Sequence, residues 1–275
     1  MAFQTWQVGL DIQNGQLCAI GIQRRRNGWQ LRHWWQHTLP HDTLRNGLVQ
    51  RPDIVIAILQ RWHRLLPSRI SLRVGFPPQL VMQRQLSLPA TSLRDSAHGH
   101  YIQAAAKRFF PIEPGALAMD FRLNGGETRQ LTLTATRKEA LQNWLYCLQQ
   151  IDRVPQIVDV TPSALSVLAQ TLELGADASL VHRLSDHWLW YSPQHHERPW
   201  GWCPLDEAAT FSDLQQRYLS AEGKVWYSSA LDDAPPEGTL PLSPFAALRF
   251  LQPPLPVCER AYTLALGLAL RPGDH

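Results

Sequence analysis

The stretch VGLDIQNGQL (residues 8–17) is the part of the sequence that says most about the fold. Apolar residues on both sides of Asn14-Gly15 predict two strands joined by a tight turn, because Asn-Gly is a strong hairpin signal. Asp11 stands just before this turn. Backbone N–H groups at such a turn can hold a phosphate, and a nearby carboxylate can organise a magnesium ion. A hairpin of this kind could therefore be part of a nucleotide-binding site.

The segments that follow extend the hairpin into a meander. A third strand is expected near Trp29–His37, so the chain does not open with the strand–helix–strand unit of dinucleotide-binding domains. Helix and strand patterns then alternate, which predicts the α/β class. Further strands are expected at 70–76, 80–88, 118–123, 130–136, 156–160, 180–184, 188–191 and 224–227, and helices at 52–65, 92–109, 137–152, 163–172, 205–219 and 262–270.

The composition describes a globular chain with room for one large domain or two lobes. The 275 residues are 44% hydrophobic and 18% charged, which argues against disorder. We find no apolar run of the roughly 18 residues needed to span a bilayer, and the first residues lack the pattern of a signal peptide. Four widely spaced cysteines suggest buried thiols in a reducing compartment. We therefore expect a cytoplasmic protein.

The basic residues and possible metal ligands of the sequence do not indicate a binding site. Arg24-Arg25-Arg26 is the only tight basic cluster, and it precedes the turn signal Asn27-Gly28, which suggests a solvated turn. A DNA-binding surface would need more basic residues on one face, so we do not expect nucleic-acid binding. Cys203 with His195 and His196 fits no standard zinc spacing, and no metal site is predicted.

Residues that could support enzyme chemistry are equally sparse. Asp120 and Asp159 could act as paired carboxylates, but a strand-end cap and a fold aspartate before a proline turn explain them better. Ser163 is not part of a G-x-S-x-G nucleophile elbow. We expect no catalytic residues.

Three stretches, taken in order, resemble the PilM family of actin-like proteins from type IV pilus machinery. They are the opening hairpin, the block HYIQAAAKRFFPIEPGALAMDFRL (residues 100–123), and VPQIVDVTPSALSVLA (residues 154–169) together with YTLALGLALRPGD (residues 262–274). The short length and the QPPLP run (residues 252–256) are most similar to a branch of the family that is linked to DNA utilisation.

The resemblance implies an actin-like (ribonuclease H-like) fold in two lobes, with a small inserted subdomain and a reduced second lobe. Residues 1–73 and 154–172 would form the first lobe, and residues 74–153 the inserted PilM-type subdomain. Residues 173–261 would form the second lobe, and residues 262–275 would return to the first.

In actin-like ATPases, two hairpins hold the phosphates, and comparison with that pattern indicates an eroded site. Asp11 keeps the acidic position, but Gln13 replaces a glycine, so only Asp11, Asn14 and Gly15 remain as vestigial cofactor-binding residues. The second hairpin, SLVHRLSDHWLWY (residues 179–191), has no glycine. The expected adenine-binding element, KVWYSSALDDAPP (residues 224–236), also lacks one. We therefore expect no cofactor, with ATP and magnesium as the weaker alternative.

PilM-like proteins bind the short cytoplasmic N-terminal segment of a membrane partner, PilN, which implies a scaffold held peripherally at the inner membrane. Self-association into a ring is a further expectation. The partner peptide would lie in a groove between the first lobe and the inserted subdomain, which the expected strand 81–88 and helix 98–109 could line. An active ATPase and a direct DNA-binding protein are the alternatives. The expected groove residues are Val81, Arg84, Leu86, Leu88, Tyr101 and Ile102.

Overall fold

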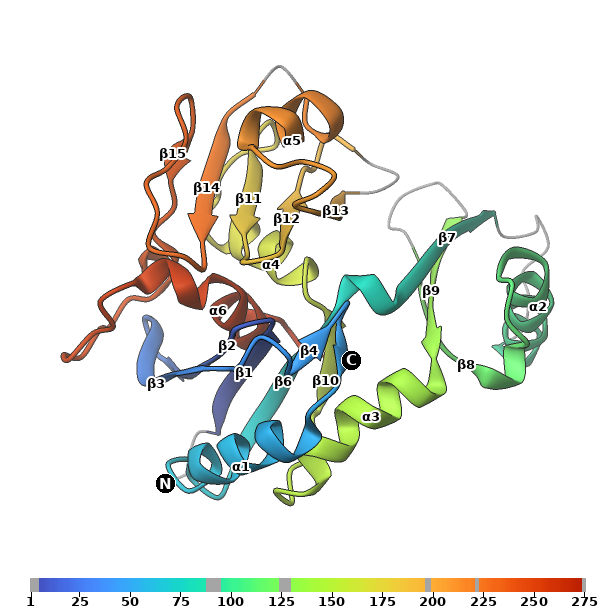
Figure 1. The fold of residues 1–275 in the computed structure, drawn as a ribbon, viewed down its shortest axis with the longest axis horizontal. Helices are drawn as coiled ribbons and strands as arrows, with labels where there is room; N and C mark the ends of the chain where they lie inside the picture. Colours follow the sequence, from blue (N-terminus) through green and yellow to red (C-terminus); the bar gives the residue numbers. More distant parts are fainter. Residues whose placement is uncertain (1–4, 88–94, 124–129, 196–198, 221–222, 274–275) are drawn as a thin grey trace. The chain divides into compact units, whose positions relative to one another are not determined.

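The computed structural model describes residues 5–87, 95–123, 130–195, 199–220 and 223–273 (Figure 1). The chain divides into two compact units. The larger unit contains residues 1–79 and 147–275, and the smaller unit contains residues 80–146. The smaller unit falls inside the range 74–153 expected for an inserted subdomain, and the finer lobe boundaries remain a prediction.

The first sheet of the larger unit grows from the opening hairpin. Gly15 adopts φ +91°, a conformation that glycine reaches without strain, and the turn reverses the chain between two antiparallel strands. The next strand completes the predicted meander, and two parallel strands extend the other side. The sheet order is β10-β6-β1-β2-β3, with β1 Trp6–Gln13, β2 Gln16–Arg25, β3 Gly28–Thr38, β6 Ile70–Phe76 and β10 Ile157–Val160.

The second sheet repeats the same plan later in the chain. Two antiparallel pairs form a meander, and a parallel strand follows after a helix. Its order is β13-β12-β11-β14-β15, with β11 Ser179–Arg183, β12 His187–Tyr191, β13 Trp200–Pro204, β14 Val225–Ser229 and β15 Leu240–Pro241. Two lobes, each with a mixed five-stranded sheet of this kind, define the actin-like fold that the resemblance predicted.

Two helices, α4 (Ser163–Thr171) and α6 (Thr263–Leu270), share one apolar core with residues of both sheets (Figure 1). All eight residues of α6 are buried, as expected for a helix that is apolar on every side. A Cβ at Gly9 would lie 1.9 Å from the Ala265 carbonyl oxygen, and one at Gly267 would lie 2.2 Å from that of Ala164. Glycine at these positions therefore allows α6 to approach β1 and α4 closely.

Among the described residues, the larger unit also contains the α-helices α1 (Pro52–His63) and α5 (Phe211–Tyr218). The buried Trp62 of α1 stacks on Trp35 of β3, with ring centroids 6.1 Å apart. The prediction of a helix over 205–219 is wrong at its start. Thr210 and Asp213 form a reciprocal capping box, which satisfies the first backbone N–H groups and makes α5 begin at Phe211.

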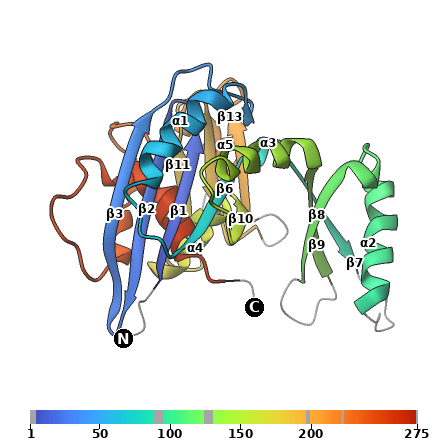
Figure 2. The ribbon, with the colours of Figure 1, turned by 90° about the horizontal axis from the view of Figure 1, so that it is seen from below.

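The smaller unit is a three-stranded antiparallel sheet with one helix packed on it. The sheet order is β7-β9-β8, so β7 and β8 are its edges among the described residues. Figure 2 shows α2 along this sheet, and their apolar residues form a separate core. The elements are β7 Val81–Ser87, α2 Asp95–Phe109, β8 Leu117–Leu123 and β9 Gln130–Arg137, after which α3 (Lys138–Gln149) leads back to the larger unit.

Candidate functional site

The two hairpin turns of the larger unit contact each other directly. Asn14 in the β1–β2 turn donates its Nδ2–H to Asp186 Oδ2 in the β11–β12 turn at 3.2 Å. In return, the Ser185 hydroxyl donates to the Asn14 carbonyl oxygen at 2.9 Å. The turns from which both hairpins would hold a phosphate are thus joined to each other. The Asp186 carboxylate at this junction would also repel a phosphate.

The Asp186 carboxylate has further partners that keep it ionised. Its Oδ1 accepts from the Nδ1 of His187 at 2.6 Å. Partial burial raises the pKa of Asp186, but the hydrogen bonds from His187 and Asn14 and the charge effect of His187 outweigh it, so the pKa lies below its usual value. At neutral pH the Asp186 carboxylate is therefore ionised at the junction of the two turns.

Asp11, the acidic residue expected to organise magnesium, is enclosed. It is 2% exposed, and the Gln13 side-chain amide donates to its Oδ1 at 2.7 Å. Burial raises the pKa of the Asp11 carboxyl to about 7, and the Gln13 hydrogen bond opposes this rise. Gln13 thus occupies one of the two carboxylate oxygens that a hydrated ion could use. In the described parts of the chain, no group of three or more His, Cys, Asp or Glu residues could hold a metal ion.

The raised pKa predicts that acid stabilises the larger unit around Asp11. Between about pH 4 and pH 7 the folded carboxyl keeps a proton that the unfolded chain releases, so stability falls as pH rises through this window. The steepest slope should be about 1 kcal/mol per pH unit. Asp11→Asn should flatten it in urea unfolding at pH 4.5, 6 and 7.5. The exposed control Asp177→Asn should keep the wild-type slope, and an unchanged slope in Asp11→Asn would contradict the prediction.

Two histidines lie buried behind the second turn. His182 stands where the second hairpin would need an acidic residue, and its Nδ1 contacts the Ser228 hydroxyl at 3.1 Å. Burial, with a smaller effect from His187, lowers the pKa of His182 to about 3, so its imidazole stays neutral. This strand therefore offers no carboxylate to a metal ion.

The other aspartates of the sequence analysis serve different parts of the fold. Asp159 in β10 forms a buried ion pair with Arg271, whereas Asp120 lies exposed in β8 of the smaller unit. Sequence reasoning missed Arg271, although a lone arginine directly after the wholly apolar stretch 264–270 could have signalled a buried partner.

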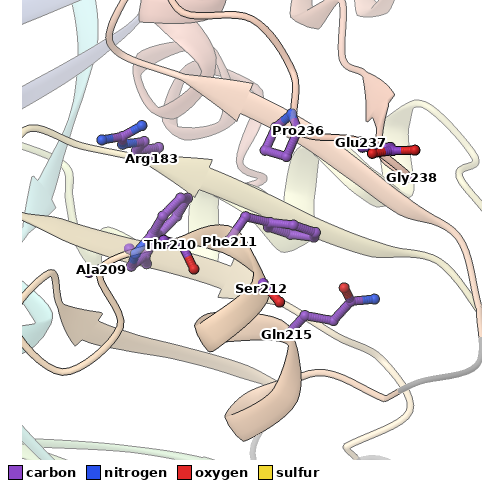
Figure 3. Close-up of a pocket in the computed structure, with 10 residues that line it drawn as sticks. Arg183, Ala209, Thr210, Phe211, Ser212, Gln215, Pro236, Glu237 and Gly238 are labelled. Carbon is purple, nitrogen blue, oxygen red and sulfur yellow. The ribbon is translucent and has the colours of Figure 1, made fainter.

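The expected adenine-binding element borders a pocket of about 600 Å³ (Figure 3). Arg183, which lines the pocket, donates its Nη1–H to Asp233 Oδ2 at 3.2 Å, and the Tyr227 hydroxyl donates to the same oxygen at 3.0 Å. In Figure 3 the start of α5 with Phe211 faces the loop that carries Pro236. The pocket is lined by Arg183, Trp188, Ala209, Thr210, Phe211, Ser212, Gln215, Pro236, Glu237 and Gly238.

The residues expected to hold a partner peptide lie in the smaller unit and differ in exposure. Leu86 and Ile102 are 4% and 5% exposed and belong to the core of this unit. Val81 is half-buried and Arg84 is exposed on the edge strand β7, and the Tyr101 hydroxyl donates to the Ser87 carbonyl oxygen at 2.7 Å. Leu88 lies outside the described residues.

Comparison with known proteins places this two-lobed fold in a family. The family model "Type IV pilus assembly protein PilM" matches residues 9–181. The chain belongs to the PilM family of type IV pilus assembly proteins. It is 25% identical over 274 residues to DNA utilization protein HofM of Escherichia coli (strain K12), covering 98% of each chain.

Two solved structures share the fold. The PilM–PilN type IV pilus biogenesis complex matches with a TM-score of 0.69 and 16% identity, over 96% of this chain and 97% of the other. The cytoplasmic domain of EpsL, an inner-membrane component of the Vibrio cholerae type II secretion system, matches with a TM-score of 0.55 and 9% identity, over 94% of both chains. In the present chain, no helix among the described residues is both long enough and apolar enough to cross a membrane.

Proposed function

We propose that this chain is a cytoplasmic, non-catalytic scaffold of an inner-membrane assembly of the type IV pilus or DNA-uptake kind. The observation that carries this proposal is the direct bonding of the two hairpin turns, Asn14 to Asp186 and Ser185 to Asn14. A nucleotide would have to break these bonds and displace Gln13 from Asp11. Anion binding there would also work against the Asp186 charge.

A fluorescent ATP analogue with magnesium tests the loss of the nucleotide site. We expect no saturable binding by the full chain at analogue concentrations up to the millimolar range. Gln13→Gly should not restore binding, since the bonds between the two turns remain in that variant. Saturable, magnesium-dependent binding by the unaltered chain would instead establish the alternative of a working ATPase-type site. The pocket beside Phe211 is the feature that favours this alternative, because a flat ring could enter it.

The scaffold role includes capture of a partner peptide, which we place on the edge strand β7. Among the described residues β7 pairs only with the strand β9, so an extended segment could add to the sheet along the other edge of β7. Val81 and Arg84 lie on this strand and reach the surface. The occupant we propose is the N-terminal cytoplasmic segment of a PilN-like membrane protein. It would tie the scaffold to the inner membrane, and a ring of copies would repeat this contact.

Isothermal titration calorimetry with a synthetic peptide of that segment should show binding in the micromolar range. Val81→Asp combined with Arg84→Glu should weaken it at least tenfold, because the pair lies along the proposed docking strand. Phe121→Ser provides the control, since Phe121 is exposed on β8 at the opposite edge of the same sheet. An equal loss of peptide affinity in both variants, or no heat of binding with the folded chain, would contradict docking on β7.

A further inference from the structure

The loop of residues 249–257 lies beside the β2–β3 hairpin and is fixed to it by backbone hydrogen bonds. The N–H groups of Arg249 and Phe250 both donate to the Trp29 carbonyl oxygen, at 2.9 Å and 3.1 Å. The Leu31 N–H donates to the Phe250 carbonyl oxygen at 2.9 Å. In Figure 1 this loop projects beside the start of β3. We call residues 24–32 and 249–257 together the arginine–proline surface.

The loop presents apolar side chains to water in a fixed conformation. Leu251 and Leu255 are 42% and 39% exposed, and Val257 is 103% exposed. The indole Nε1–H of Trp34 in β3 donates to the Pro254 carbonyl oxygen at 2.9 Å, which holds the middle of the loop against the sheet. Exposed aliphatic side chains on a tethered loop, rather than scattered singly, are typical of a contact surface.

Positive charge surrounds these apolar residues. Arg24, Arg25 and Arg26 at the hairpin tip are exposed, as are Arg32 and Arg249. Residues 12–41 and 238–258, which contain the whole surface, carry these five arginines and no aspartate or glutamate. These five arginines give the surface a charge of +5, while the entire chain has a net charge of only +3.

Two of the arginines at the tip contact neutral groups of the same hairpin. The Arg24 guanidinium lies over the Trp29 ring, 5.0 Å from its centroid, and the Arg25 Nε–H donates to Gln30 Oε1 at 2.7 Å. Both partners are neutral, so the charges remain available to an anion outside the chain.

From this arrangement we propose that the arginine–proline surface binds directly to a bilayer containing anionic phospholipid. Arginines near a negatively charged leaflet attract the headgroups, and aliphatic side chains beside them enter the boundary between headgroups and acyl chains. A nucleic acid would satisfy the arginines but would leave Leu251, Leu255 and Val257 in water. A bilayer can contact both the arginines and the exposed aliphatic side chains. This contact is separate from capture of a partner peptide, since it needs lipid alone.

Vesicle sedimentation tests this inference with the full chain and no other protein. Vesicles of 30% phosphatidylglycerol in phosphatidylethanolamine should bind the chain, and pure phosphatidylcholine vesicles should not. An arginine near an anionic surface contributes about fivefold in affinity, so R24Q/R25Q/R26Q should weaken binding at least tenfold. L255Q/V257Q should also weaken it severalfold. The matched controls are R61Q/R64Q/R69Q and L65Q/V154Q, which remove the same groups from exposed positions elsewhere.

The controls make each outcome decisive. Loss of binding in the surface variants but not in the controls supports the inference, and far-UV circular dichroism checks that every variant is folded. Equal losses in the control variants, or no vesicle binding at low salt, would overturn it. The same holds if a 30-base-pair DNA duplex binds with dependence on Arg24–Arg26 while vesicles do not, because the surface would then serve nucleic acid.

Discussion

Gly9→Val should lower the free energy of unfolding of the larger unit by about 3 kcal/mol or more. Valine favours strands, so the substitution would stabilise β1 if nothing stood in its way. Here the added Cβ would meet the backbone of the buried helix α6, with the Ala265 carbonyl oxygen at 1.9 Å and the Ala269 nitrogen at 2.6 Å. Backbone atoms in a packed core cannot move aside as a flexible side chain would. Thermal unfolding should show the change as a midpoint lowered by roughly 6–12 °C.

Gly273→Val is the matched control for this experiment. A Cβ at Gly273 meets nothing within 4 Å among the described atoms, so the same substitution should change the midpoint by less than about 1–2 °C. If Gly9→Val unfolded at the wild-type temperature, the close approach of α6 to β1 would be incorrect.

Asp159→Ala should destabilise the larger unit by about 3–5 kcal/mol, since it removes the carboxylate from a buried ion pair. Asp159 and Arg271 are 7% and 6% exposed. Arg73 is also buried in the neighbouring strand β6, and its Nε and Nη1 have no hydrogen-bond partner among the residues that the structure describes. Burial and the nearby Arg271 lower the pKa of Arg73 to about 10. Without Asp159, the buried Arg271 guanidinium would lose this carboxylate partner while the like charge of Arg73 remained nearby.

A second variant separates this explanation from a simple packing defect. Asp159→Ala with Arg271→Met removes both charges of the pair and should recover part of the lost stability. Asp206→Ala, at an exposed carboxylate of the same unit, should be nearly neutral in the same urea titration. If the double variant were less stable than Asp159→Ala, the ion pair would not be the cause.

Local patterns predicted the elements of the fold well. The Asn14-Gly15 turn and the apolar runs around it were enough to predict the opening meander, and the structure confirms all three strands. The helix over 262–270 is likewise confirmed as α6. The start of α5 was missed because the residues after Pro204 include the good helix formers Leu, Glu and Ala, whereas the Thr210 cap is a specific hydrogen-bond arrangement.

The candidate site depended on contacts that local patterns do not contain. Asn14 and Asp186 are 172 positions apart, and nothing in either segment indicates that their side chains meet. The missing glycine at Gln13 indicated an eroded site, but its hydrogen bond to Asp11 appears only in the folded chain. Similarly, the apolar residues Leu86 and Ile102 could have lined a groove or filled a core, and only the fold distinguishes the two.

The central position of α6 has a consequence for how the protein is made. This helix fills the core shared by both lobes, yet it is encoded about 190 residues after the first sheet has nearly all of its strands. On a ribosome, the smaller unit is continuous in sequence and can fold as soon as residue 146 has emerged, since domains generally fold as units during synthesis. The apolar face that β1 and β2 present to α6 stays exposed until residues 263–270 have been synthesised. Chaperones should therefore bind the growing chain mainly through this first sheet.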